Sequence, residues 1–143
     1  VHDNRNFALT VSQFTATSPK GFKGSSTPRG SLEEPFNPLE LVMASGATFI
    51  ARGYALKIEH LKGLIKKAIL HKGFSFLEIL QPCITFFDNR RFYQERIYEL
   101  KGPFPKKKAE EKIKEWDYKN GKNKIPIGLF YKAEKPSFDE LVD

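Results

Sequence analysis

Hydrophobic and polar positions along the chain predict two buried strands with one helix between them. Residues 47–51 (ATFIA) and 74–80 (FSFLEIL) are short apolar runs typical of buried strands. Residues 57–72 carry apolar side chains at helical spacing with lysines elsewhere, and Gly73 follows as a helix stop. A strand, a crossover helix and a second strand predict parallel strands in a sheet covered by helices on both faces. The pattern therefore indicates an α/β fold.

The first residues predict the end of an earlier strand of the same sheet. Residues 1–2 precede a polar turn that contains Asp3, Asn4 and Asn6. Ligands bind to such sheets at the carboxyl ends of the strands. We expect this turn and Cys83, which follows the strand at 74–80, to lie at such ends.

A long loop separates this turn from the first predicted helix. Residues 10–36 are rich in Ser, Thr, Gly and Pro and follow neither the helical nor the strand period, which predicts a functional or disordered loop. Asn37 then provides an N-cap with Pro38 at the first helical position. The helix continues over residues 39–45, and Gly46 fits the position after its end.

Beyond residue 100 the pattern is weaker. Residues 106–118 predict a charged helix, and Asn120-Gly121 predicts a turn. Residues 125–131 (IPIGLFY) predict a short strand or extended segment, and residues 138–143 (FDELVD) a polar terminus.

Composition limits the classes of protein. The 143 residues are 40% hydrophobic and 13% aromatic, enough for the core of one domain. No apolar run approaches the roughly 20 residues that span a bilayer, and nothing resembles a signal peptide, so we expect a soluble, cytoplasmic protein without a membrane partner. A single cysteine, Cys83, excludes an intrachain disulfide and any metal site built from several thiolates of this chain alone.

The net charge of +7 is concentrated between residues 101 and 135, where lysines outnumber acidic residues. Such a segment suits a nucleic-acid surface, an acidic protein or a polyphosphate cofactor. It equally suits a solvated lysine-rich face. Composition leaves these alternatives open.

The residues with metal-binding chemistry are few. Asp3, Asn4 and Asn6 form an oxygen-rich turn, and Mg²⁺ prefers oxygen ligands that it often shares with phosphate. An ordinary Asx turn explains the same residues. Cys83 is either a ligand or a small buried apolar side chain. There is no phosphate-loop glycine motif and no serine elbow, so these residues alone predict a basic α/β domain without an assigned activity.

A resemblance extends this interpretation. DNRNFALTVSQFTATSPKG resembles the segment that begins at the magnesium-binding asparagine in the β subunit of 2-oxoacid:ferredoxin oxidoreductases. That segment commonly reads Asp-Asn-x-x-Tyr-Gly-Leu-Thr-x-Gly-Gln and is followed by a Ser/Thr-Pro-rich run. The likeness continues in the family's order through STPRG, EEPFNPLEL, GATFIAR, HKGFSFLEILQPCITF, YQERIYEL and IPIGLFYKAEKPSF.

The resemblance implies part of a thiamine diphosphate-binding, pyrophosphate-domain fold with a parallel sheet flanked by helices. Residues 1–100 would form the C-terminal half of this domain, and residues 101–143 a C-terminal extension. The cofactor motif of the family begins with Gly-Asp-Gly and closes with the asparagine that Asn4 matches. The remaining half of the β subunit would then supply an aspartate ligand of Mg²⁺, most of the diphosphate cradle and three cysteines of a 4Fe–4S cluster.

The resemblance also implies the roles of four residues. Asn4 would give a side-chain oxygen to Mg²⁺, and Asn6 its main-chain carbonyl. Leu9 matches a leucine that lines the substrate pocket near the thiazolium ring of thiamine diphosphate. Cys83 matches the fourth cysteine of the 4Fe–4S cluster. No residue of this chain receives a catalytic role.

The implied activity is coenzyme A-dependent oxidative decarboxylation of a 2-oxoacid such as pyruvate, with electrons passing to ferredoxin. The partners would be the other half of the β subunit and an α subunit, and the present chain alone would be inactive. Lys106, Lys107 and Lys108 are a hypothetical docking surface for ferredoxin.

Two alternatives remain. Another thiamine diphosphate-dependent decarboxylase would have no use for Cys83. A non-catalytic module that binds nucleic acid would need base-stacking aromatics or a reading motif, and we find neither.

Three sites in the N-terminal segment depart from the family pattern. Phe7 replaces Tyr, Ala8 replaces Gly, and Val11-Ser12 replaces x-Gly. They surround the implied cofactor and substrate, so we expect them to affect the choice of substrate more than the class of reaction.

Overall fold

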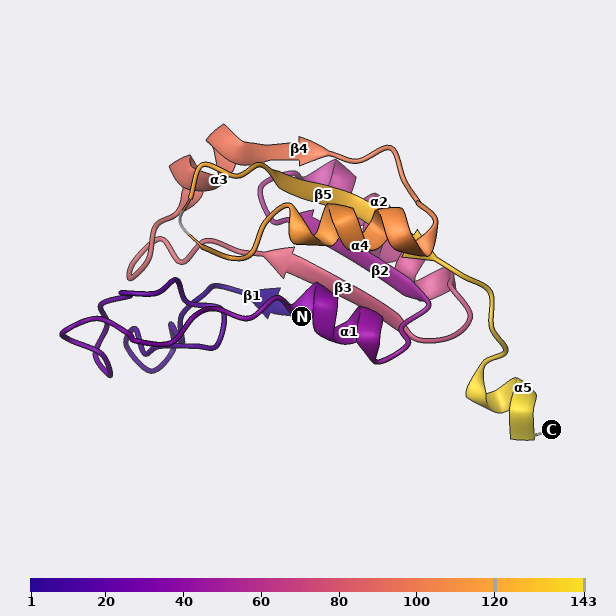
Figure 1. Ribbon diagram of the computed structural model, residues 1–143, viewed down its shortest axis with the longest axis horizontal. Coiled ribbons are helices and arrows are strands. Elements are labelled where there is room, and N and C mark those ends of the chain that lie inside the picture. Colours follow the sequence, from indigo (N-terminus) through magenta and orange to yellow (C-terminus); the bar gives the residue numbers. More distant parts are fainter. Residues whose placement is uncertain (120, 143) are drawn as a thin grey trace.

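The computed structural model describes residues 1–119 and 121–142. Its centre is a five-stranded sheet in the order β1-β3-β2-β5-β4 (Figure 1). The strands are β1 (His2–Asp3), β2 (Phe49–Tyr54), β3 (Ser75–Leu80), β4 (Ile97–Glu99) and β5 (Ile125–Lys132). The helices are α1 (Pro38–Ala44), α2 (Ile58–Leu70), α3 (Arg90–Arg96), α4 (Lys106–Lys114) and α5 (Phe138–Val142).

The strand directions confirm the predicted α/β arrangement. β2 and β3 are parallel and joined by α2, and β1 runs parallel to β3 on its other side. β5 is antiparallel to β2, and β4 is parallel to β5. The sheet is therefore parallel around β3 and carries an added pair of strands beyond β2.

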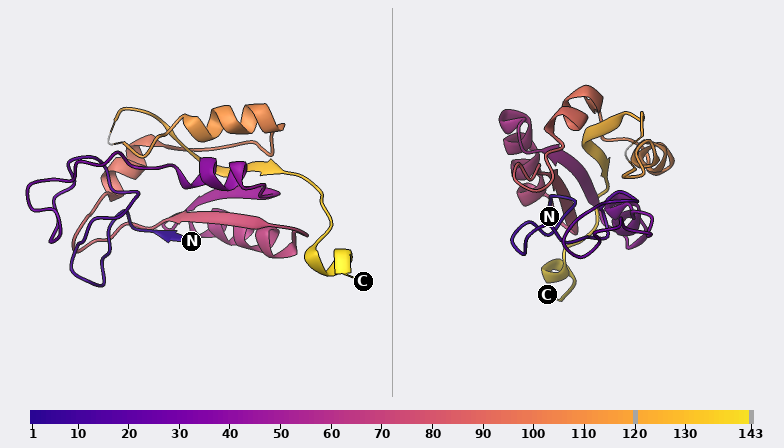
Figure 2. Two further views of the ribbon diagram at one scale, coloured as in Figure 1. Left: turned by 60° about the horizontal axis from the view of Figure 1, so that its bottom comes forward. Right: turned by 90° about the vertical axis from the view of Figure 1, so that its left-hand side faces the viewer.

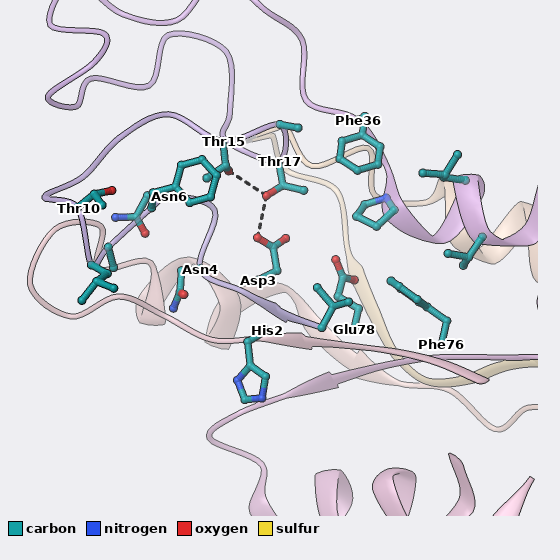
Figure 3. Close-up of a pocket in the computed structure, with 18 residues that line it drawn as sticks. His2, Asp3, Asn4, Asn6, Thr10, Thr15, Thr17, Phe36, Phe76 and Glu78 are labelled. Carbon is teal, nitrogen blue, oxygen red and sulfur yellow. Dashed lines mark hydrogen bonds between the residues drawn. The ribbon is translucent and has the colours of Figure 1, made fainter. Parts of the chain in front are cut away.

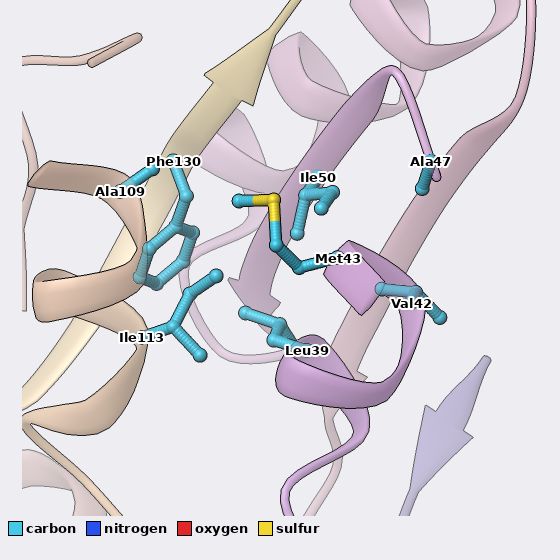
Figure 4. Packing of buried hydrophobic residues seen from close by; sticks show 8 residues of the cluster. All are labelled: Leu39, Val42, Met43, Ala47, Ile50, Ala109, Ile113 and Phe130. Atoms are coloured by element: carbon cyan, nitrogen blue, oxygen red, sulfur yellow. The ribbon is translucent and has the colours of Figure 1, made fainter. Parts of the chain in front are cut away.

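Helices cover both faces of the sheet, as Figure 2 shows in its right-hand view. On one face α1 and α4 bury a cluster of apolar side chains against β2 and β5 (Figure 4). Its members are Leu39, Val42, Met43, Ala47, Ile50, Ala109, Ile113 and Phe130. On the other face Leu64 of α2 packs with Phe49, Ala51 and Leu129. Successive residues of β2 thus face opposite layers, because side chains alternate along a strand.

The predicted elements of the first half are confirmed with small changes of length. The Asn37 side-chain oxygen accepts a hydrogen bond from the Leu39 amide at 3.1 Å, and Gly46 has a φ of +83°, as the predicted cap and helix end require. β2 continues to Tyr54, beyond the predicted strand, and residues 10–36 contain neither a helix nor a strand.

Elements after residue 80 follow the predictions less closely. α4 ends at Lys114, not near Tyr118, because Trp116 and Tyr118 are fully buried and the chain has to leave the helix to place them in the core. α3, β4 and α5 were not predicted. The predicted turn at Asn120-Gly121 includes residue 120, which lies outside the described residues.

The segment after residue 100 belongs to the same sheet. β5 lies between β2 and β4, and α4 packs beside α1 over it. α5 projects from the body, at the end opposite the long loop (Figures 1 and 2). A domain boundary at residue 100 stays a prediction. None of the helices that the structure describes is long and apolar enough to cross a bilayer.

Candidate functional site

The carboxyl ends of β1 and β3 lie side by side, which places the N-terminal turn (residues 3–6) next to the start of the Cys83 segment (residues 83–87). In the parallel register Asp3 pairs with Leu80. The Gln81 amide donates to the Asp3 carbonyl at 3.0 Å, and the Asn4 amide nitrogen donates to the Gln81 carbonyl at 2.8 Å. The turn is thereby fixed to the chain that leads into Cys83.

A cavity of about 820 Å³ opens beside the N-terminal turn (Figure 3). Three of the predicted site residues line it, namely Asn4, Asn6 and Leu9. Phe76 and Glu78 of β3 line it from the sheet, and residues near the start of α1 complete an apolar wall. The cavity therefore has a polar end at the strand termini and an apolar end against α1.

Asp3 forms the Asx turn that we named as the alternative to a metal ligand. Its carboxylate Oδ1 accepts from the Arg5 amide at 2.8 Å and from the Thr17 hydroxyl at 2.7 Å. Both hydrogen bonds of this oxygen are therefore made within the protein, one in the turn and one to the long loop. The other oxygen, Oδ2, is buried and has no hydrogen-bond partner among the described residues.

Asn4 and Asn6 have side chains in different situations. Asn4 is half-buried, and its nitrogen bonds to Gln81 while its oxygen remains available to a ligand in the cavity. Asn6 is only 4% exposed, and its amide oxygen and nitrogen have no oxygen or nitrogen partner within the described ranges. The Asn6 side chain lies beside the Cys83 thiol and interacts with it.

Leu9 stands at the tip of a short hairpin that rises from the turn. Phe7 and Gln13 pair through two main-chain hydrogen bonds of 2.9 and 3.3 Å, and Leu9 between them is 97% exposed. An exposed leucine on the rim of a cavity can contact a ligand that lies inside it. The pocket role of Leu9 stays a prediction.

Cys83 is buried beside Asn6 and not in the wall of the cavity. Burial by itself raises the pKa of its thiol, but hydrogen bonds from the main chain of residues 85–87 and from Asn6 outweigh burial and lower the pKa. These donors stabilise a thiolate, the form that binds metals. The structure thus brings Asn4, Asn6 and Cys83 into one region, because Asn4 bonds to Gln81 and Asn6 lies beside the Cys83 thiol.

The described residues do not by themselves form a metal site of His, Cys and acidic side chains. Within residues 1–119 and 121–142, no group of three or more His, Cys, Asp and Glu side chains could hold a metal ion. Asn4, Asn6 and Cys83 would each need further ligands to hold a metal group. That requirement agrees with the ligand sets implied by the resemblance.

A buried network of charged side chains lies behind the cavity and was not predicted from the sequence. Glu78 and Arg52 form a fully buried ion pair of 2.6 Å between neighbouring strands, and the Tyr118 hydroxyl bonds to both. Burial raises the pKa of Glu78, and the Arg52 guanidinium opposes this shift. The signal was present: each of two adjacent apolar strands carries one charge, and the charges have opposite signs.

Two family models match consecutive parts of the chain. Residues 1–79 match the model described as thiamine pyrophosphate enzyme, C-terminal TPP binding domain. Residues 83–143 match the model for the C-terminal part of the pyruvate ferredoxin oxidoreductase beta subunit. The boundary between the two matches falls just before Cys83.

Curated and solved relatives cover almost the whole chain. The 2-oxoacid:ferredoxin oxidoreductase beta subunits of Sulfolobus sp and Saccharolobus solfataricus are 42% and 39% identical over 99% and 94% of it. A solved 2-oxoglutarate:ferredoxin oxidoreductase from Magnetococcus marinus, with 2-oxoglutarate, coenzyme A and succinyl-CoA bound, superposes with a TM-score of 0.89 at 30% identity over 99% of the chain.

The chain spans about half the length of these relatives: 50% and 48% of the two curated subunits and 48% of the solved chain. Both family models, the identities and the fold agree with the predicted α/β thiamine diphosphate-binding arrangement. The chain belongs to the β-subunit family of the 2-oxoacid:ferredoxin oxidoreductases.

Proposed function

We propose that the chain is part of the β subunit of a 2-oxoacid:ferredoxin oxidoreductase. The whole enzyme would decarboxylate a 2-oxoacid oxidatively, transfer the acyl group to coenzyme A and pass electrons to ferredoxin. The observation that supports this proposal is that Asn4 and Cys83 follow adjacent parallel strands, with Asn4 bonded to Gln81 and Asn6 beside the Cys83 thiol. The enzyme, which we place in the cytoplasm, also contains the remaining half of the β subunit and an α subunit.

The N-terminal turn holds Mg²⁺ and thiamine diphosphate in this proposal. The Asn4 side-chain oxygen and the Asn6 carbonyl would be Mg²⁺ ligands. Asn4 fits this role because its nitrogen bonds to the Gln81 carbonyl, which leaves its oxygen for the metal. Thiamine diphosphate, when bound, supplies the electron sink that allows CO₂ to leave. Leu9 and the apolar wall of the cavity position the substrate and exclude water from it.

Cys83 supplies one thiolate to a 4Fe–4S cluster whose other three cysteines come from the remaining half of the β subunit. The main-chain donors of residues 85–87 favour the thiolate and make hydrogen bonds to its sulfur. Hydrogen bonds to cluster sulfurs are among the factors that set a reduction potential. The Cys83 segment would therefore supply a cluster ligand and help to set the reduction potential of the cluster.

Cys83 distinguishes this proposal from a thiamine diphosphate enzyme without redox chemistry. A non-redox decarboxylase needs the Mg²⁺ ligands but no thiolate at the end of β3. The nucleic-acid alternative has no observation in its favour, since the lysine-rich segment contributes a helix and a strand to the enzyme-family fold.

The proposal is tested with two variants of the complete enzyme. Asn4→Ala should require more Mg²⁺ and thiamine diphosphate for half-saturation while its iron content stays at the wild-type level. Cys83→Ala should lose iron, sulfide and ferredoxin reduction while it still binds thiamine diphosphate. Exposed Asn123 offers a control for Asn4, because Asn123→Ala removes the same side chain far from the cavity.

Iron and sulfide analysis, low-temperature EPR of the reduced enzyme and calorimetric titration of the cofactor give the three readouts. A Cys83→Ala enzyme with full iron content and the wild-type EPR signal would contradict the cluster assignment. Unchanged half-saturation in Asn4→Ala would remove this residue from the Mg²⁺ site.

A further inference from the structure

Arg5 lies between the two cofactor segments but belongs to neither ligand set. It is flanked in sequence by Asn4 and Asn6, and its side chain is completely buried. Its backbone has a φ of +56°, a conformation that few residues other than glycine adopt. Arg5 does not line the cavity.

Hydrogen bonds connect Arg5 to three separate parts of the chain. Its Nε donates to the Thr17 carbonyl in the long loop at 3.0 Å, and its terminal nitrogen donates to the Tyr118 carbonyl. Its own main chain donates to Asp3 Oδ1 at 2.8 Å and accepts from the Ser18 hydroxyl at 2.7 Å. The N-terminal turn, the long loop and the segment before β5 are therefore joined at one residue.

Aromatic rings surround the same guanidinium and extend the connection to Cys83. The Arg5 Cζ lies 5.3 Å from the centre of the Trp116 ring and 6.0 Å from the rings of Phe87 and Phe92. Phe87 closes the Cys83 segment, since its amide donates to the Cys83 carbonyl at 3.0 Å and its main chain also bonds to the thiol. Arg5 thus contacts the residue that shapes the surroundings of the sulfur.

A guanidinium suits this position because it presents several donors in a rigid plane and stacks on aromatic faces. An apolar residue would fill the same volume but leave the carbonyls of Thr17 and Tyr118 without these donors. A lysine would keep the charge but could not hold two carbonyls and several rings in one fixed geometry.

We propose that Arg5 is a positioning residue that holds the N-terminal turn and the Cys83 segment in register, so that the Mg²⁺ site and the cluster site both depend on it. This inference rests on the proposed function. Residues behind metal ligands fix the orientation of those ligands, and their loss commonly weakens metal binding.

The test uses Arg5→Met and Arg5→Lys in the complete enzyme, with Arg96→Met as the matched control. Arg96 also packs on Phe92, with its Cζ 4.4 Å from the centre of the ring. Its guanidinium donates hydrogen bonds to the carbonyls of Phe92 and Gly121, and not to the N-terminal turn or the Cys83 segment. Two measurements do not depend on turnover. Calorimetry gives the Mg²⁺ concentration at which thiamine diphosphate binding is half-maximal. Chemical analysis gives the iron and sulfide content of the purified enzyme.

Arg5→Met should raise the half-saturating Mg²⁺ concentration by about 10- to 100-fold, the usual range for a residue that supports metal ligands. Arg5→Met should also lower the iron content of the purified enzyme. Arg5→Lys should give values between those of Arg5→Met and wild type in both measurements. Arg96→Met should give wild-type values. Loss of both sites together is the signature of shared positioning.

Three results would overturn the inference. The first is an Arg5→Met enzyme with wild-type Mg²⁺ half-saturation and wild-type iron content. The second is an equal effect of Arg96→Met, which would indicate general loosening around Phe92. The third is failure of both Arg5 variants to fold, which would make Arg5 a residue of global stability. A wild-type enzyme that binds neither cofactor would instead contradict the proposed function itself.

Discussion

Two adjacent residues of the N-terminal hairpin have left-handed backbone conformations. Val11 and Ser12 have φ values of +67° and +62°, and Ser12 stands where the resemblance places a glycine. The Ser12 carbonyl accepts from the Ser25 amide at 2.8 Å. Gly24 permits this approach, because a Cβ on it would lie 2.0 Å from the Ser12 oxygen. The hairpin that carries Leu9 is therefore tied to the long loop although its tip is exposed.

Replacement of Leu9 tests its contribution to substrate binding. Leu9→Ala removes apolar surface from the rim of the cavity, and a loss of this size in an apolar pocket lowers kcat/KM by roughly tenfold or more. The measurement is kcat/KM for pyruvate and for 2-oxoglutarate, since a pocket residue should affect the two acids unequally. Leu32 is also highly exposed, at 85%, but does not line the cavity, so Leu32→Ala should keep the wild-type values. Equal effects of both variants would contradict a pocket role for Leu9.

Residue roles divide into those that sequence could indicate and those that it could not. Asn4, Asn6 and Cys83 were indicated by strand ends and by a family pattern, and the fold places them together. The positioning role of Arg5 was not predicted, because it depends on a hydrogen bond to the Tyr118 carbonyl, more than a hundred residues away in sequence. A single arginine in a polar turn carries no local signal of burial.

At the scale of elements, Asn37 joins two helices that are distant in sequence. Its oxygen caps α1, as the Asn-Pro pair predicted, and its nitrogen donates to the carbonyls of Ile113 at 3.1 Å and Trp116 at 3.4 Å. The cap motif does not predict the hydrogen bonds of the nitrogen at the end of α4. One side chain therefore fixes the start of α1 against the end of α4.

Two substitutions separate these functions of Asn37. Asn37→Ala loses the cap and both hydrogen bonds at the end of α4. We expect the lost cap to lower the free energy of unfolding by about 1 kcal/mol, and the lost hydrogen bonds to lower it by about as much. Asn37→Ser keeps a capping oxygen but has no amide donor, so it should lose only the second part. Urea denaturation of the β subunit measures the free energy of unfolding. If Ser and Ala destabilise equally, the cap contributes nothing measurable.

Helices and strands with local patterns were predicted well, whereas those that depend on distant contacts were not. α1, α2, β2 and β3 follow from capping residues, helical spacing and apolar runs. The early end of α4 follows from the burial of Trp116 and Tyr118, which only the assembled core requires. The position of β5 between β2 and β4 likewise comes from pairing across the sheet, and no local pattern encodes strand order.

At the scale of the whole molecule, the lysines that begin α4 and the Cys83 segment lie at opposite ends of the sheet. Lys106, Lys107 and Lys108 begin α4 just after Phe104, whose amide bonds to Phe130 near the end of β5. Because β5 is antiparallel to β2, this is the end of the sheet opposite to Cys83. Arg90 begins α3 directly after the Cys83 segment. The lysines that we considered as a ferredoxin-docking surface thus lie far from the predicted cluster ligand.

Salt dependence distinguishes distant attraction from direct docking. We compare Lys107→Glu/Lys108→Glu at the far end with Arg90→Glu/Arg91→Glu beside the Cys83 segment, so that each enzyme has two charges reversed. At about 0.01 M salt, charges act over about 30 Å, and both variants should reduce ferredoxin more slowly than wild type. At about 0.15 M salt the range falls to about 8 Å.

At the higher salt concentration the lysine variant should regain the wild-type rate, because its charges lie beyond the reach of a ferredoxin bound near Cys83. The arginine variant should stay slow, because its charges would lie within the docked surface. Reduction of a small uncharged dye should be unaffected in both variants, which shows that the cluster is intact. A lysine variant that stays slow at high salt, with a normal rate toward the dye, would place the docking surface on α4 and would require an electron route away from Cys83.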